Sequence, residues 1–171
     1  MNKIVKLTII AIVISVSISM LSTSLFSDGH NAPADTSKKV EKIGLLKGNT
    51  TAKTLSVEGS LPKFEVSAQT SGTLAGVEVT SMATYWAEMQ ANGTLYGECP
   101  NAGVFMAQDG VATFRASGTG SFTADGGTTF KGVVYVQTTA PSLASLNGAA
   151  LVYNWDVDAE GNATWELWEW K

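Results

Sequence analysis

The chain has 171 residues, of which 11 are basic and 15 are acidic, so its formal net charge is −4. This balance argues against a nucleic-acid-binding protein, because such proteins usually carry a basic patch. The single cysteine, Cys99, excludes an internal disulfide.

An uncharged, mostly apolar run covers residues 7–27, with Lys3 and Lys6 at its start. This layout is typical of a secretory signal. Ala32-Pro33-Ala34 fits the small-x-small cleavage pattern, although cleavage closer to the apolar run is also open. The run is also about long enough for a membrane span, which takes roughly 20 residues. We therefore expect residues 1–27 to form a hydrophobic helix that is a signal peptide or a membrane anchor.

Either reading places the domain outside the cell, secreted or anchored at the outer face of the cell membrane. The membrane would be contacted only through residues 4–27, and only if they are not cleaved. Cleavage would also remove His30, the one histidine. A domain without histidine excludes Ser-His-Asp and Cys-His nucleophile systems as normally built, and it lacks the commonest zinc ligand.

We expect no metal site and no cofactor. The run Asp156-x-Asp158-x-Glu160 resembles a calcium loop, but an EF-hand loop needs a bidentate Glu at its twelfth position. Leu167 occupies that position here. A solvated acidic turn is the better interpretation.

Residues 28–60 are polar and mixed, which predicts a linker with at most a short helix over 38–46. The charge is uneven along the chain, since 35–63 hold six lysines and three acids, whereas acids dominate after Cys99. From residue 61 the sequence changes to short runs rich in Val, Thr, Phe, Tyr and Trp. We therefore expect residues 61–171 to be the folded domain.

Turn dipeptides of the Asn-Gly and Asp-Gly type separate these runs at intervals of roughly 15 residues, as hairpin turns would. The expected strands are 63–71, 74–81, 82–90, 94–107, 111–123, 128–139, 149–158 and 163–170, with a helical turn beginning at 141–143. This pattern predicts an all-β fold, an up-and-down meander that closes into a roughly eight-stranded barrel. Gly118 and Gly120 would lie on one face and mark a barrel corner. The strand 163–170, with its tryptophans, would close the barrel.

Four segments of the domain form a recognisable set: Tyr85-Trp86, Asn92 to Glu98, Gly118-x-Gly120-x-Phe122-Thr123 and Leu167 to Lys171. In these segments the domain resembles a family of small, uncharacterised archaeal and bacterial exported proteins. The stretch from Gly118 to Gly132 more distantly resembles the allene oxide cyclase and dirigent-type barrels. This second resemblance implies an eight-stranded barrel with a central cavity for apolar ligands.

Four residues are the candidate ligand-binding site: Tyr85, Trp86, Tyr96 and Glu98. We expect a barrel domain that binds a small apolar ligand or a surface partner. One alternative is a histidine-independent cyclase or isomerase that uses Glu98, because a carboxylate inside a barrel could act as an acid or base. Strand alternation puts Glu98 and Tyr96 on one face and Cys99 on the other. A second alternative is a structural cell-surface subunit, which would expose an edge strand.

Three positions match the N-glycan acceptor pattern: Asn49, Asn92 and Asn162. Asn92 and Asn162 fall at expected hairpin turns, where they would be accessible. The sequence leaves the ligand and the oligomeric state open.

Overall fold

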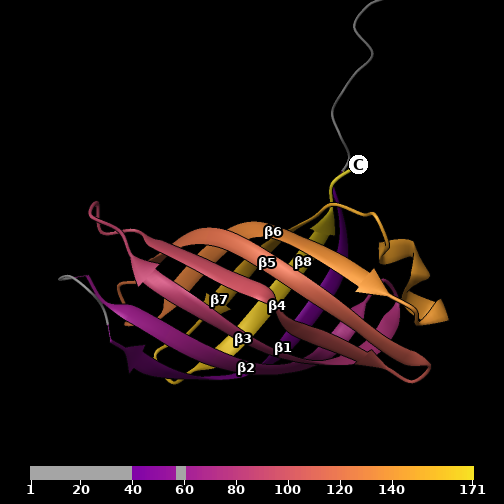
Figure 1. Cartoon of the computed structure of the whole chain (residues 1–171), viewed down its shortest axis with the longest axis horizontal. Coiled ribbons are helices and arrows are strands. Elements are labelled where there is room, and N and C mark those ends of the chain that lie inside the picture. The colour runs from indigo at the N-terminus through magenta and orange to yellow at the C-terminus, as the bar shows by residue number, and fades with distance from the viewer. Residues whose placement is uncertain (1–39, 57–60) are drawn as a thin grey trace, which may run out of the picture. The chain divides into compact units, whose positions relative to one another are not determined.

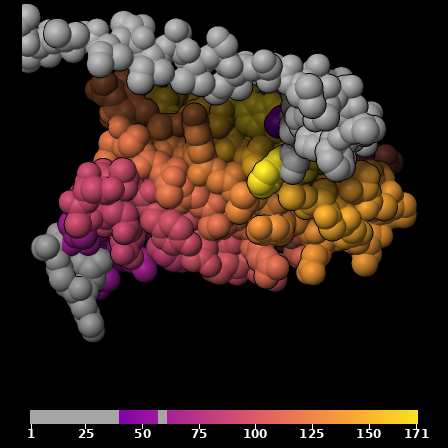
Figure 2. Space-filling model, turned by 90° about the horizontal axis from the view of Figure 1, so that it is seen from above, coloured from indigo at the N-terminus to yellow at the C-terminus, as the bar shows by residue number. Residues whose placement is uncertain are grey.

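The computed structural model describes residues 40–56 and 61–171. These residues form an all-β, closed antiparallel barrel in which each strand pairs with the next and the last pairs with the first, as predicted (Figure 1). The strands are β1 Glu41–Leu55, β2 Lys63–Leu74, β3 Val77–Met89, β4 Leu95–Ala107, β5 Gly110–Phe122, β6 Thr128–Thr138, β7 Leu151–Val157 and β8 Asn162–Glu169. Figure 2 shows one face of the barrel, on which side chains of β3 to β6, coloured from magenta to orange, pack against one another.

Strand β1 corrects the expected linker over 28–60 and the expected short helix over 38–46. It pairs with β2 over 44–55 and with β8 over 41–49. Its inward positions hold Gly44, Leu46 and Gly48 rather than a row of large apolar residues. A built Cβ on Gly44 would lie 3.0 Å from Leu167 Cδ1. Without large side chains on the buried face, β1 lacks the alternation that identifies a strand.

Two lysines of β1 form ion pairs with acids on the neighbouring strands. Lys42 pairs with Glu166 on β8, and Lys53 Nζ lies 2.6 Å from Glu65 Oε1 on β2. Both ion pairs join adjacent strands of the barrel.

The expected strands 74–81 and 82–90 are also corrected, because they are parts of β2 and one continuous β3. The real turn is at Ala75 and Gly76, whose φ angles are 50° and 79°. Two central residues with positive φ are what a two-residue hairpin turn requires. Alanine is an unusual residue for this conformation, so the pattern did not mark the turn. The expected list omits β1 and counts β3 as two strands. These two errors cancel, so the predicted number of strands is right.

A short 3₁₀ helix, η1 (Pro141–Leu146), lies at one end of the barrel, beyond the end of β6, and confirms the expected helical turn (Figure 1). Leu143 and Leu146 are buried there. The carboxylate of Asp109 accepts hydrogen bonds from the Ser142 amide at 2.8 Å and from its hydroxyl at 2.6 Å. These bonds hold the pKa of Asp109 below its usual value. We call this the closed end and the opposite end the open end.

The last strand closes the barrel, as predicted. Its partner is β1 rather than the expected first strand over 63–71, and only one of the three tryptophans over 165–170 is buried. β8 follows β7 through the turn at Gly161 and pairs with β1. Trp165 and Leu167 are buried, whereas Trp168 is half-buried at an outward position and Trp170 is 53% exposed. At the same turn, the Asp158 carboxylate accepts hydrogen bonds from the amides of Glu160 and Asn162. The carboxylate therefore stabilises the turn itself.

The expected signal peptide or anchor, the cleavage site and His30 lie outside the described residues. Within 40–56 and 61–171, no helix is long and apolar enough to cross a membrane.

Candidate functional site

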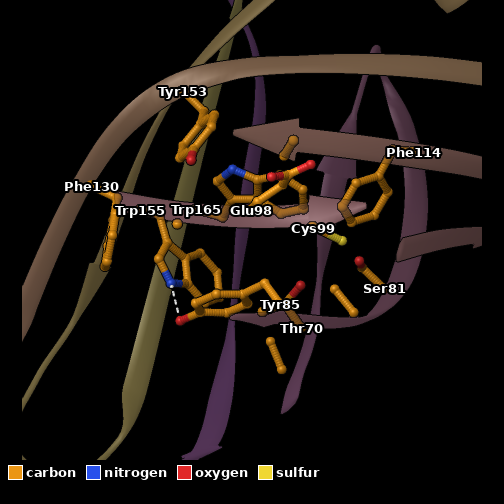
Figure 3. Close-up of a pocket in the computed structure, with 14 residues that line it drawn as sticks. Thr70, Ser81, Tyr85, Glu98, Cys99, Phe114, Phe130, Tyr153, Trp155 and Trp165 are labelled. Atoms are coloured by element: carbon orange, nitrogen blue, oxygen red, sulfur yellow. Dashed lines mark hydrogen bonds between the residues drawn. The ribbon is translucent and has the colours of Figure 1, made fainter. Parts of the chain in front are cut away.

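The middle of the barrel contains a cavity of about 60 Å³, which we call the chamber (Figure 3). Seven of the strands, β2 to β8, contribute to its wall. The lining residues are Ala68, Thr70, Ser81, Ala83, Tyr85, Gly97, Glu98, Cys99, Phe114, Ala116, Phe130, Tyr153, Trp155 and Trp165.

The chamber is hollow because four positions of its wall carry only a methyl group or no side chain. Strands β2 to β5 supply these residues, Ala68, Ala83, Gly97 and Ala116, and the aromatic rings come from β3 and β5 as well as from β6 to β8. Toward the closed end, the interior is filled by fully buried large side chains. These are Leu46, Leu74, Phe105, Val134, Leu143, Leu151 and Leu167.

Lumen-facing glycines make room for the aromatic rings. Gly97, Gly118 and Gly132 lie in one register row across β4, β5 and β6, and Tyr153 continues the row on β7. A built Cβ on Gly118 would lie 2.5 Å from the Tyr153 hydroxyl. A built Cβ on Gly120 would lie 2.7 Å from a ring carbon of Phe130. Gly118 and Gly120 lie on one face as predicted, and it is the inner face, where their lack of a side chain is required for packing.

The aromatic rings of the chamber form one connected cluster around Trp165. Its ring stacks on Phe105 at 5.4 Å between centroids and meets Tyr153 edge-on at 6.2 Å. Trp155 lies edge-on to both Trp165 and Tyr85. Such edge-to-face pairs fix ring orientations, and with them the directions of the N–H and O–H groups.

Two indole N–H groups in this cluster differ in their hydrogen bonding. Trp155 Nε1 donates to the Tyr85 hydroxyl at 3.0 Å (Figure 3). Trp165 is 6% exposed, and its Nε1 has no hydrogen-bond partner among the described residues. A buried donor without a partner costs about 1–3 kcal/mol. The chamber wall therefore contains an N–H group for which no described residue is a hydrogen-bond acceptor.

The polar side chains that point into the chamber are uncharged at neutral pH. Burial raises the pKa of Tyr85 to about 12, and it also raises the pKa values of Tyr153 and of the Cys99 thiol. Among the described residues, the buried polar side chains are those of Thr70 and Ser81. The chamber thus offers neutral donors and no counter-ion for a charged ligand.

The four predicted site residues are separated by the barrel wall. Tyr85 points into the lumen, between Phe130 and Trp155. Because Leu95, Gly97 and Cys99 are the buried positions of β4, alternation directs the side chains of Tyr96 and Glu98 outward. Glu98 lines the chamber as part of the wall, but its carboxylate accepts a hydrogen bond from the Tyr96 hydroxyl at 3.4 Å.

Trp86 lies on the same outer face as Tyr96, and their ring centroids are 5.4 Å apart. Lys63 Nζ lies 4.2 Å from the centroid of the Trp86 ring. The four predicted residues leave out most of the chamber wall, above all Tyr153, Trp155 and Trp165. Alternation along 151–157 could have identified the first two, because it puts both on the buried face.

The three glycan acceptor positions are all exposed. Asn49 on β1 and Asn162 on β8 are register partners, and their side chains hydrogen-bond at 3.1 Å. The Asn92 side chain accepts hydrogen bonds from the amide and the hydroxyl of Thr94 within its turn. In the described part of the chain, no three His, Cys, Asp or Glu side chains gather closely enough to hold a metal ion.

Tyr85 predicts a loss of stability at alkaline pH. Its folded pKa of about 12 exceeds the ordinary value of 10.0, so the unfolded chain ionises first as the pH rises. Its contribution to the free energy of unfolding is therefore complete below about pH 10 and falls by roughly 2–3 kcal/mol as the pH approaches 12. Denaturant unfolding over this range should show the loss, and Tyr85→Phe should make it shallower. An equally steep loss in the variant would contradict the assignment to Tyr85.

No protein-family model matches the chain, and no curated protein matches its sequence. The fold is similar to the crystal structure of a conserved protein of unknown function, RPA1785, from Rhodopseudomonas palustris. The two share 9% sequence identity at a TM-score of 0.64, over 77% of this chain and 97% of that one. At this identity the likeness shows the fold alone.

Proposed function

We propose that the protein is an exported barrel that binds a small, uncharged ligand in its lumen. The observation that carries the proposal is the Trp165 N–H at the wall of the chamber, which no group in the described part of the chain accepts. A ligand with a hydrogen-bond acceptor would satisfy this donor and displace any water from the apolar rings around it. Ligand sites commonly have this composition, with mostly apolar walls and a few placed polar groups.

Two further lines of argument support the proposal. The neutral hydroxyl and thiol groups of the chamber suit an uncharged molecule, because a charge buried without a partner costs several kcal/mol. The resemblance to allene oxide cyclase and dirigent-type barrels implies the same use of the lumen. Export rests on the apolar run over residues 7–27 and its preceding lysines.

Neither alternative function has a specific observation in its favour. A cyclase or isomerase built on Glu98 needs that carboxylate inside the lumen, and it lies beside Tyr96 on the outer face. A structural subunit that pairs through an edge strand needs an unpaired strand. Each strand of the described barrel is paired on both sides.

The proposal can be tested by NMR of the tryptophan side chains with 2-butanone as the probe. We expect a saturable shift of the Trp165 indole N–H signal, assigned through Trp165→Phe. Ala116→Leu should fill the chamber and abolish this shift without unfolding the protein. Ala91→Leu, in the exposed 90–94 turn, is the matched control and should keep it.

Two results would count against lumen binding. The first is no shift of the Trp165 signal up to the solubility limit of the ketone. The second is an unchanged shift in both Ala116→Leu and a second filling variant, Ala83→Leu, each shown to be folded by its own spectrum.

A further inference from the structure

The open end of the barrel contains a second hollow, of about 370 Å³, which we call the vestibule. Its volume lies within the range of about 300–1,000 Å³ that is usual for ligand sites. The apolar part of its lining includes Phe64, Val66, Ala87, Leu95, Phe122 and Val157. One of these, Phe122, is 47% exposed although it occupies an inward position of β5.

The vestibule and the chamber are neighbours. Tyr85 and Phe130 line both of them, so these two rings form the partition. The rings meet edge-on with centroids 6.5 Å apart, and the Tyr85 hydroxyl accepts the hydrogen bond from Trp155. A molecule that passes this pair of rings would place one end in the small chamber and leave the rest in the vestibule.

The two compartments differ in chemistry. The chamber has neutral donors around the unpartnered Trp165 N–H, whereas the vestibule is mostly apolar toward the lumen. Asp158 and Glu160 lie in the turn that lines the vestibule, and Asp125 lies in the neighbouring turn, within electrostatic reach of Asp158. These carboxylates disfavour an anionic ligand at the entrance.

We infer that the ligand is an uncharged amphiphile, with a compact hydrogen-bond-accepting head such as a carbonyl in the chamber and an apolar chain in the vestibule. This inference rests on the proposed lumen function and specifies its ligand class. The Tyr85 and Phe130 rings would lie where the head of the ligand joins its apolar chain. The absence of a buried cation among the described residues, together with the acidic entrance, selects against a carboxylate head.

The test compares four probes of matched chain length on the full chain: 2-undecanone, n-undecane, decanoate and decylamine. Affinities are measured by quenching of tryptophan fluorescence and by the Trp165 indole signal. We expect 2-undecanone to bind about tenfold more tightly than n-undecane, the gain of satisfying one buried donor. Decanoate should bind more weakly than the ketone at neutral pH, and so should decylamine.

A series of methyl ketones tests the vestibule. Affinity should rise about fourfold with each methylene that leaves water, until the vestibule is filled. Phe122→Ala should reduce this gain per methylene and leave the affinity for 2-butanone unchanged. Trp165→Phe should instead bring the ketone and the hydrocarbon to equal affinity.

The outcomes separate this inference from the proposed function. If 2-butanone shifts the Trp165 signal but longer ketones bind no more tightly, lumen binding stands and the two-compartment ligand is wrong. Binding of decanoate, decylamine or n-undecane as tight as that of 2-undecanone overturns the uncharged acceptor head. If no ketone reaches Trp165, both fail together.

Discussion

A chain that begins at residue 61 will not fold cooperatively, whereas one that begins at residue 37 will. The shorter chain lacks β1, which pairs with β2 from Gly44 to Leu55 and with β8 from Glu41 to Asn49. Its loss would open the barrel and leave two long strands with unpaired backbone groups at their edges. It would also remove Leu46, which is fully buried.

The expected size of this effect follows from the narrow stability of a small domain, about 5–15 kcal/mol in total. The loss of two strand ladders and a buried leucine would cost more free energy than the total stability of such a domain. Thermal melting followed by far-ultraviolet circular dichroism is the measurement. The 37–171 chain is the matched control, because it contains all eight strands. A sharp melting transition in the 61–171 chain would show that seven strands suffice.

Phe105→Ala will be the most costly single substitution among the aromatic residues of the lumen. The side chain is fully buried, and its ring lies 4.6 Å from that of Phe114 and 5.4 Å from that of Trp165. Removing a packed phenylalanine from a core costs roughly 3–5 kcal/mol, because the transfer free energy is lost and a cavity remains. Urea unfolding of the full chain measures this loss directly.

Phe122→Ala is the control for this prediction, because it removes the same atoms from a side chain that is 47% exposed. We expect its cost to stay below about 1 kcal/mol, as is usual away from the core. Equal costs for the two substitutions would mean that the region around Phe105 is not tightly packed. They would also weaken the distinction between the filled closed end and the hollow chamber.

Local sequence pattern was sufficient for most of the barrel. Turn dipeptides such as Asp109-Gly110 and Asp125-Gly126 separate runs that do form strands, because glycine adopts positive φ without strain. Alternation along 151–157 puts Leu151, Tyr153 and Trp155 on one face, which is the inner face of β7. Alternation also put Glu98 and Tyr96 on one shared face, and this face is the outer face of β4.

The errors occurred where local pattern carries little information. β1 is recognisable as a strand only through its partners, since its inner face is made largely of glycine, threonine and alanine. The turn at Ala75 lacks the usual residue types, and its conformation is imposed by the pairing of Leu74 with Val77. In both places long-range pairing decides a conformation that the residues themselves leave open.

The sequence by itself determined the all-β class, the meander order and the inward or outward alternation within the recognised strands, because these depend on residues close together in the chain. Only the tertiary structure decided that β1 closes the barrel and that small residues of β2 to β5 leave a chamber among the aromatic rings of the lumen. It also decided that the Trp165 N–H has no hydrogen-bond partner among the described residues. These features depend on which side chains meet across the lumen. That meeting is set by the register of eight strands together, which no single segment specifies.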